Sequence, residues 1–528
     1  MFSPNLEEIE RAPMNVPTAH PQGIADADAR RRVLVLAVAV ALLTAVAAWR
    51  AWVLARPGTP PGIDTGNWLA FGDALIGRSV KPEGVAYPPT IPLLLVAAVR
   101  AFGATAGVAL VGGLSAIMPA IAAWFALSRA KLGGWALFLV AAVAVLPAVG
   151  DITAWGGYPQ LFAAPFVVAT LWFLDRWIRV GEVRACVGSA VAFGVILATS
   201  HFAALGVSVS IIVLLVARLA SGDVAAMTML RRAGLAAGGF VVAAAPVVVV
   251  YARLIPAVFA TQAAGGTSSA VAFDALPSEF ARVHGVATPI VAVGVLAAIG
   301  AVAVARDRRD TLWGVTVALA IGTLATLLGT REPRVLYDAP VVAALGTGVW
   351  AKTFLERRSD LPKRALAGAL AVLILVLAVS AWVEFPRQRK RFAVLSSDTV
   401  SALDWLRERT PADSLVVVTS VEGMPLGWWT EGLADRRTLG EISPRWLVFP
   451  EERVVAARAR TVIRAFDAGL DHGLRAAREA GADYLVVSGT DPLSSVLHLY
   501  QDAGQLRPVY ANDAILIVDV AHPAGRRV

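Results

Sequence analysis

The chain has 528 residues, of which 57% are hydrophobic and 16% are charged, with a mean hydropathy of +0.66. Soluble globular chains are about half apolar and a quarter charged, so the composition excludes an ordinary soluble protein. The net charge of +8 does not indicate nucleic-acid binding, because most Lys and Arg residues lie in short loops between apolar blocks, where they orient helices. The single cysteine, Cys186, excludes a disulfide framework.

The N-terminal segment predicts a cytoplasmic tail followed by an uncleaved membrane anchor. Residues 1–29 are polar and contain prolines, which is typical of a disordered segment, and three arginines follow at 30–32. Basic clusters favour the cytoplasmic side of a membrane, so we expect residues 1–32 to lie in the cytoplasm. The apolar block at 33–54 is long and has no small-residue cleavage site, so we interpret it as the first spanning helix.

The stretch at 55–103 decides the predicted topology. Its apolar run at 91–99 is short, follows two prolines and ends at Arg100. Counting this run as a span would also place the basic loop at 129–131 outside, against the cytoplasmic bias of such loops. We therefore interpret 87–103 as a membrane-surface helix within a large first outer loop.

Ten further apolar blocks bring the prediction to about eleven spanning helices in a membrane domain at 33–384. Keeping 87–103 out of the membrane places the basic loops of five later connections on the cytoplasmic side. The richness in Ala, Val, Gly and Arg is typical of high-GC bacteria, so we expect a multi-pass protein of a bacterial cytoplasmic membrane. The ten blocks are 104–127, 132–149, 160–178, 185–199, 202–218, 233–252, 287–305, 311–329, 339–351 and 365–384.

The remaining residues, 385–528, predict an extracytoplasmic α/β domain. Apolar spacing at 401–411 indicates a helix, the runs at 414–420 and 514–520 indicate buried strands, and 473–489 indicates helix, turn and strand. This part of the sequence has no GxGxxG, P-loop or metal-spaced His/Cys cluster. The predicted fold class is a polytopic α-helical membrane protein with a C-terminal soluble α/β domain.

Two carboxylates at predicted outer membrane boundaries are candidate catalytic residues, because a charge placed there is costly unless it is hydrated or used. Asp64 follows the first span. It could deprotonate an acceptor hydroxyl, or it could simply cap the helix that starts near Gly66. Asp151 follows the span at 132–149. It could face the same cavity and position the acceptor or support a cation, or it could be a solvated loop residue.

The segment after Asp151 supplies aromatic and polar candidates for substrate binding. Trp155 and Tyr158, with Gln160, could stack on a sugar, or the aromatic residues could anchor the chain at the membrane interface. His201, between two spans, could bind a phosphate or act as a base, or it could make a structural hydrogen bond.

Two further segments carry candidates for substrate binding. Arg331 and Arg334 lie in a late outer loop, where they could clamp a lipid phosphate or snorkel to lipid headgroups, and Glu332 between them offers one partner. In the C-terminal domain, adjacent tryptophans and an acidic residue could recognise a carbohydrate or an acceptor, or dock the domain onto the membrane part. These three residues are Trp428, Trp429 and Glu431.

The arrangement resembles the GT-C superfamily of polyprenyl-phosphate-dependent glycosyltransferases, which includes aminoarabinose transferases, protein mannosyltransferases and oligosaccharyltransferases. The resemblance rests on Asp64 in a long first loop, on the segment from Tyr87 to Gly103 with its prolines, on Asp151 and on the late arginine pair. The multi-pass part followed by an outer domain also fits. These features cover most of the chain as architecture and short motifs.

The resemblance implies roles for these residues. Asp64 would be the first-loop catalytic carboxylate and Asp151 the second one, while Arg331 or Arg334 would contact the lipid phosphate. The segment that starts with Trp428-Trp429 is similar to the Trp-Trp-Asp-Tyr-Gly signature of oligosaccharyltransferases, with Thr and Glu in place of Asp and Tyr. The first loop has no Asp-X-Asp or Glu-X-Asp motif, which leaves open whether a divalent cation takes part.

The expected function is transfer of a sugar from a polyprenyl-phosphate donor to an envelope glycan, lipid or protein, in contact with membrane lipids. Such a donor needs no nucleotide site, which agrees with the missing Gly-rich motifs. Two alternatives stay open. The chain could be a non-catalytic envelope assembly protein on the same scaffold, or a lipid or solute transporter, although the sequence shows no paired repeats with broken helices.

Overall fold

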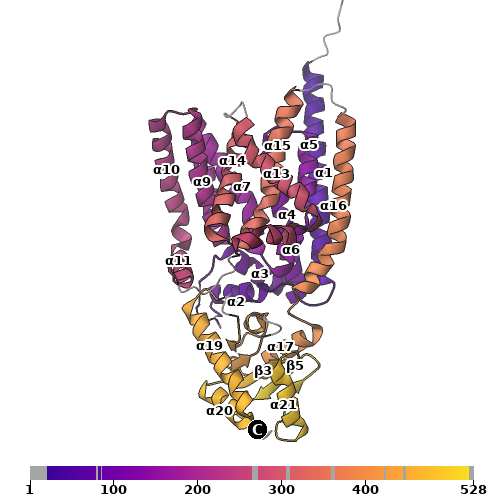
Figure 1. Ribbon diagram of the computed structural model, residues 1–528, viewed down its shortest axis with the longest axis vertical. Coiled ribbons are helices and arrows are strands. Elements are labelled where there is room, and N and C mark those ends of the chain that lie inside the picture. Colours follow the sequence, from indigo (N-terminus) through magenta and orange to yellow (C-terminus); the bar gives the residue numbers. More distant parts are fainter. Residues whose placement is uncertain are drawn as a thin grey trace, which may run out of the picture.

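The structure is a computed structural model in which a long helical bundle stands on a smaller α/β domain (Figure 1). It describes residues 21–78, 81, 83–84, 86–263, 271–304, 310–357, 363–420, 424–443 and 447–522. The first twenty residues of the predicted tail and the predicted basic loop at 306–309 lie outside the described residues.

In the described residues a helix occupies most of each predicted span. Among the described residues, eight helices are long and apolar enough to cross a membrane, and the bent pair α5–α6 makes a ninth. The two other predicted spans are α8, with 17 residues, and α15, with 19. The bundle helices are α1 (Pro21–Ala55), α4 (Ala104–Arg129), α5 (Gly134–Ala144), α6 (Pro147–Trp155), α7 (Tyr158–Val180), α8 (Val183–Thr199), α9 (His201–Ser221), α10 (Ala226–Ala244), α11 (Val248–Ala263), α12 (Leu276–His284), α13 (Thr288–Val304), α14 (Thr311–Thr330), α15 (Ala339–Arg357) and α16 (Lys363–Arg391).

The prediction of one straight helix over 132–149 followed by a loop is wrong. The chain forms α5 and then α6, bent by 44° at the break between them. Pro147 opens α6, and the residue before it, Leu146, is extended with φ −66° and ψ 140°, as steric contact with a proline ring requires. Asp151 therefore lies inside a helix and is 1% exposed, which excludes the solvated-loop interpretation.

The first loop folds into two short helices beneath the bundle (Figure 1), α2 (Thr65–Leu75) and α3 (Thr90–Phe102). At 13 residues, α3 is about 20 Å long, too short for an apolar layer of about 30 Å. Its Leu93, Leu94 and Phe102 are exposed, as in a helix that lies in the membrane surface. Gly72 of α2 allows close packing of the two helices, because a Cβ there would lie 2.4 Å from the carbonyl oxygen of Pro92.

The C-terminal region is an α/β layer with a five-stranded sheet in the order β2-β1-β3-β5-β4. β1 is parallel to β2 and β3, whereas β5 is antiparallel to β3 and β4. The two predicted helices and the three predicted strands are present, and β2 and β4 were not predicted. The elements are α17 (Ser397–Arg409), β1 (Leu415–Val418), α18 (Leu426–Trp429), β2 (Arg437–Gly440), α19 (Pro450–Ala465), α20 (Leu470–Glu479), β3 (Tyr484–Ser488), α21 (Pro492–Asp502), β4 (Tyr510–Ala511) and β5 (Ile515–Asp519).

A buried ion pair ties helices together at the end of the bundle that lies away from the α/β domain. The Arg218 Nε donates to Asp175 Oδ1 at 2.6 Å, and both side chains are fully buried. Arg218 also lies 5.3 Å from the Trp313 ring and donates to the backbone oxygen of Asp310. The pair therefore joins α7, α9 and the start of α14.

Replacing one partner of this pair should destabilise the protein strongly. Asp175→Ala leaves a buried guanidinium without its closest carboxylate, so we expect a loss of about 3–5 kcal/mol in unfolding free energy. The double variant Asp175→Leu/Arg218→Leu should recover most of that loss. Thermal unfolding of the detergent-purified chain measures both.

The half-exposed surface pair Asp404–Arg407, at 2.6 Å, is the matched control. Asp404→Ala should cost at most about 1 kcal/mol, because solvent screens exposed pairs. Equal melting temperatures for Asp175→Ala and Asp404→Ala would contradict the structural role of the buried pair.

Candidate functional site

The first carboxylate, Asp64, is held at the start of α2 by backbone contacts with a turn between α6 and α7. The N–H groups of Ile63 and Asp64 both donate to the carbonyl oxygen of Trp155, at 2.9 and 3.2 Å. Gly62 and Gly156 make this approach possible: both have positive φ, and a Cβ on Gly62 would lie 3.3 Å from Gly156 Cα. Segments more than ninety residues apart along the chain thus form one wall.

The Asp64 side chain is not a helix cap. It occupies the N-cap position of α2, but it makes no side-chain capping bond, so the structural alternative considered for this residue fails. The Asp64 side chain is 7% exposed. Burial raises the pKa of Asp64 to about 6, although the neighbouring Arg334 guanidinium acts to lower it. A carboxylate with such a pKa can take up and release a proton near neutral pH.

Arg334 is the cation of the site. Its Nη2 lies 3.9 Å from Asp64 Oδ2, and its Nε lies 3.7 Å from Glu332 Oε1. The guanidinium also stands 5.0 Å from the Trp155 ring and 5.5 Å from the Phe202 ring. The side chain is 27% exposed, so the cation is available to a ligand from outside.

The second carboxylate, Asp151, is linked to Trp155 through the hydroxyl group of Tyr337. The Tyr337 hydroxyl donates to Asp151 Oδ2 and accepts a bond from Trp155 Nε1 at 3.3 Å. Arg282 Nη1 lies 3.6 Å from the same carboxylate oxygen. Asp64 and Asp151 are therefore both connected to Trp155, one through its backbone and the other through its ring.

An aromatic group closes the site beside Asp64. The Tyr87 ring packs against Trp68 at 4.3 Å and meets the His201 ring edge-on at 5.3 Å. Tyr87 and His201 thus contact each other, and their roles as binding residues stay predictions. His201 Nδ1 is buried without a hydrogen-bond partner in the described part of the chain, which does not fit the structural hydrogen bond considered for this residue.

Gln160 connects the aromatic turn to the segment of Arg334. Its Nε2 donates to the Arg334 carbonyl oxygen at 2.8 Å and to Asp338 Oδ1 at 3.1 Å. Burial raises the pKa of Asp338 to about 6, against the effect of the Gln160 bond. Gln160 therefore positions the 334–338 segment. Tyr158, which follows the same turn, is fully buried, so its ring is not exposed for stacking on a sugar.

Sequence analysis missed Asp338, Tyr337 and Arg282. Asp338 satisfies the criterion that singled out Asp64, because it is a carboxylate at the end of a predicted outer loop. Arg282 is a cation between the predicted spans at 233–252 and 287–305 and could have been found in the same way. Tyr337 had no signal, because its role depends on contacts with residues far away in sequence.

Arg331 and the tryptophan pair, which were also predicted to bind substrate, contact residues other than Asp64 and Arg334. Arg331 is exposed, stands 5.6 Å from the Phe273 ring and accepts a bond from Val271 N–H through its carbonyl oxygen. Of the two predicted arginines, Arg334 contacts Asp64. Trp428 and Trp429 are buried, and Trp429 Nε1 donates to the Gly62 carbonyl oxygen at 3.2 Å. These contacts match the docking interpretation of the tryptophan pair.

Glu431 belongs to a buried ion cluster between the first loop and the α/β domain. Lys81 Nζ lies 3.0 Å from Glu431 Oε2 and 3.3 Å from Glu83 Oε1, and Thr438 donates to Glu431 Oε1 at 2.7 Å. Burial raises the pKa of Glu431, and Lys81 counteracts that effect. The cluster fixes the α/β domain under α2.

The described residues contain no group of three or more His, Cys, Asp or Glu side chains that could hold a metal ion. The chemistry that the described cluster offers is therefore a protonatable carboxylate, a partly exposed guanidinium and a second carboxylate bound to a tyrosine. An acid–base group beside an anion-binding group suits group transfer from a phosphate.

No protein-family model and no curated protein matches the chain, but solved structures match its fold. ArnT from Cupriavidus metallidurans, bound to undecaprenyl phosphate, has a TM-score of 0.57 and 15% identity, covering 94% of this chain and 99% of that one. The chain has a GT-C-like fold. AglB from Archaeoglobus fulgidus, an archaeal oligosaccharyltransferase in complex with an inhibitory peptide and a dolichol-phosphate, has a TM-score of 0.56 and 14% identity, covering 85% and 69%. The predicted resemblance of fold to the GT-C superfamily is confirmed.

The docking of the α/β domain on this GT-C-like scaffold depends on the absence of a side chain at Gly66. A Cβ there would lie 2.7 Å from Trp429 N and 2.8 Å from Trp428 C, both backbone atoms. Gly66→Ala should therefore push the tryptophan pair away from α2. We expect trypsin to cut faster at the basic residues 389–391 between bundle and domain, measured by limited proteolysis of the purified chain.

Gly234→Ala is the control, because nothing lies within 4 Å of a Cβ at that helical position. Its cleavage rate should equal that of the parent chain. Identical rates for Gly66→Ala and the parent would show that the close contact does not hold the domain in place.

Proposed function

We propose that the chain is a membrane glycosyltransferase that moves a sugar from a polyprenyl-phosphate donor to a cell-envelope acceptor on the outer face of the cytoplasmic membrane. The observation that carries the proposal is the pairing of Asp64 with Arg334 at 3.9 Å. It brings a buried carboxylate with a pKa near 6 to a partly exposed cation. One group can accept a proton, and the other can hold a phosphate.

The reaction follows from these two groups. The acceptor hydroxyl gives its proton to the Asp64 carboxylate while its oxygen forms a bond to the anomeric carbon of the sugar. The bond between that carbon and the phosphate oxygen breaks, and the polyprenyl phosphate leaves with the electron pair. Arg334 stabilises the charge that develops on the departing phosphate. No oxidant, reductant or nucleotide is required.

Asp151 supports the site without touching the reacting atoms in this scheme. Its bonds to Tyr337 and Arg282 fix the wall that carries Trp155, and the Trp155 ring in turn lies under the Arg334 guanidinium. We therefore assign Asp151 as a positioning residue for the cation, and Trp155 as a platform for the sugar or the acceptor.

The matched folds support the class of donor. The ArnT structure holds undecaprenyl phosphate, and the AglB structure holds dolichol-phosphate, so two proteins of this fold bind polyprenyl phosphates. A lipid donor also suits a site at the end of spanning helices, because its tail can stay in the bilayer while its phosphate reaches Arg334. The tryptophan pair is occupied by domain docking, so we assign acceptor recognition to Tyr87 and Trp155.

Asp64→Asn should abolish transfer. Loss of a general base lowers rates by about 10²–10⁴-fold, so the glycan should fall below detection in a host whose own gene is replaced by the variant. Envelope glycan composition, compared at equal protein levels, measures the effect. Asp73→Asn is the control, because Asp73 lies on the same loop but pairs with Arg100. Normal glycans with Asp64→Asn would instead favour a non-catalytic assembly protein on this scaffold.

Transfer should also depend on pH through Asp64. The base works when ionised, and its pKa is about 6, so the rate should rise with pH through about 6 and then level off. Since Arg334 lowers the pKa of Asp64, Arg334→Gln should move this acidic limb to higher pH as well as slow the reaction. Rate–pH profiles of the purified protein test this. A limb that does not move would mean that another group titrates.

A further inference from the structure

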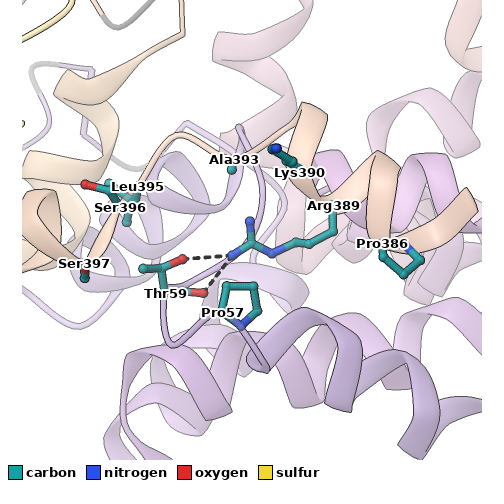
Figure 2. A pocket seen from close by; sticks show the side chains of 9 residues that line it. All are labelled: Pro57, Thr59, Pro386, Arg389, Lys390, Ala393, Leu395, Ser396 and Ser397. Atoms are coloured by element: carbon teal, nitrogen blue, oxygen red, sulfur yellow. Dashed lines mark hydrogen bonds between the residues drawn. The ribbon is translucent and has the colours of Figure 1, made fainter.

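A cavity of about 350 Å³ lies where the bundle meets the α/β domain, and none of its nine lining residues belongs to the Asp64–Arg334 cluster (Figure 2). Three chain segments form it: the residues after α1, the last turns of α16, and the start of α17. The lining residues are Pro57, Thr59, Pro386, Arg389, Lys390, Ala393, Leu395, Ser396 and Ser397.

The lining of this junction cavity is cationic and hydroxylated. Arg389 and Lys390 contribute two positive charges, and no lining residue is acidic. The first residue of α17, Ser397, also lines the cavity, so the positive end of that helix dipole faces this region. Guanidinium, ammonium, hydroxyl groups and a helix N-terminus are the groups that bind phosphate in proteins.

The hydrogen bonds that hold Arg389 in place use its Nε and Nη2 atoms. The side chain is 3% exposed; its Nη2 donates to the carbonyl oxygen and hydroxyl of Thr59, at 2.9 and 3.0 Å, and its Nε donates to the Leu54 carbonyl oxygen at 3.4 Å. Figure 2 shows both bonds to Thr59 leaving from one nitrogen. In the described part of the chain no hydrogen bond uses Nη1. The guanidinium is thus fixed, and its Nη1 group is left to donate to a ligand.

The cavity lies at the level of the membrane surface. Trp52 on α1 and Trp382 on α16 are 52% and 59% exposed, and both stand a few residues before the lining residues of their helices. Exposed tryptophans gather at the boundary between apolar layer and headgroups. The headgroup of a membrane lipid is therefore the anion that this cavity meets.

A bound anionic headgroup would also explain the basic run at 387–391. Arg387, Arg389, Lys390 and Arg391 follow the apolar part of α16 at the end of the bundle that carries the α/β domain. In the proposed orientation this end is outside, where the bias of basic residues toward the cytoplasm gives no reason for four cations in five positions. The topology prediction had left this cluster unassigned.

We propose that the junction cavity binds the phosphate group of an anionic phospholipid, between Arg389, Lys390 and the start of α17. The lipid would tie the end of α16 to the α/β domain and fix the height of the domain above the bilayer. The proposal stands apart from sugar transfer, since it uses none of the groups assigned to that reaction.

Titration of the detergent-purified full chain with dioleoylphosphatidylglycerol, followed by native mass spectrometry, tests the proposal. We expect one tightly bound lipid, with dioleoylphosphatidylcholine binding more weakly. Lys390→Gln should weaken phosphatidylglycerol binding about tenfold, as expected for one lost charged hydrogen bond. Ala393→Trp, at an exposed lining position, should block the cavity without changing the charge.

Two controls separate this site from general attraction and from catalysis. Arg387→Gln removes the same charge from a side chain that is 71% exposed and does not line the cavity, so binding should be unchanged. Asp64→Asn should also bind normally, which separates this proposal from the proposed function. Equal losses in Lys390→Gln and Arg387→Gln, or no saturable binding, would overturn the proposal. Displacement of the lipid by millimolar inorganic phosphate would overturn the lipid assignment in favour of a soluble phosphate ligand.

Discussion

The site depends on one backbone contact, in which the N–H groups of Ile63 and Asp64 share the carbonyl oxygen of Trp155. This contact fixes the first loop against the turn between α6 and α7. Trp68 Nε1 adds a bond to the Gly156 carbonyl oxygen at 2.9 Å. The contact needs glycine at positions 62 and 156, because a Cβ on Gly62 would lie only 3.3 Å from Gly156 Cα and from the Trp155 carbonyl oxygen. It also places Asp64 close to Trp155, the residue whose ring lies 5.0 Å from the Arg334 guanidinium.

The break between α5 and α6 brings the second carboxylate to the same turn. A break inside a membrane leaves carbonyl oxygens without helical partners, and these need other donors. At the C-terminal end of α5, Arg50 Nη2 donates to the Ala144 carbonyl oxygen at 3.0 Å. In the first turn of α6, Gln388 Nε2 donates to the Pro147 carbonyl oxygen at 3.3 Å, which holds α16 against the bend. Arg50 is fully buried, and its charge also suits the negative end of the α5 dipole. The first and last long helices thus support the bend from both sides.

The sequence was informative where the membrane itself imposes a rule. Among the described residues, apolar length predicted the eight membrane-length helices and the bent pair, and the cost of charge at a membrane boundary drew attention to Asp64 and Asp151. The bend was missed because the apolar run is continuous, although Pro147 marked it. β2 has four residues like β1 but no continuous apolar run, and β4 has only two residues.

The contacts themselves could not be predicted, because they join residues far apart in sequence. Tyr337 donates to Asp151 across 186 positions, and Trp429 donates to Gly62 across 367. Nothing in a local pattern distinguishes a tryptophan pair that docks a domain from one that binds a sugar. Likewise Lys81 had no signal, since its partners Glu83 and Glu431 come from both sides of the domain junction.

Two of the Asp–Arg pairs, Asp175–Arg218 and Asp64–Arg334, show how similar residues can have different roles. Asp175 and Arg218 are both fully buried at 2.6 Å, so neither can exchange its partner without leaving a buried charge behind. Asp64 and Arg334 are 3.9 Å apart, and the arginine is 27% exposed, so its guanidinium can turn toward an incoming phosphate. On the proposed function, that phosphate would offset the positive charge that lowers the pKa of Asp64. Donor binding would then make the carboxylate a stronger base at the moment when the acceptor must lose its proton.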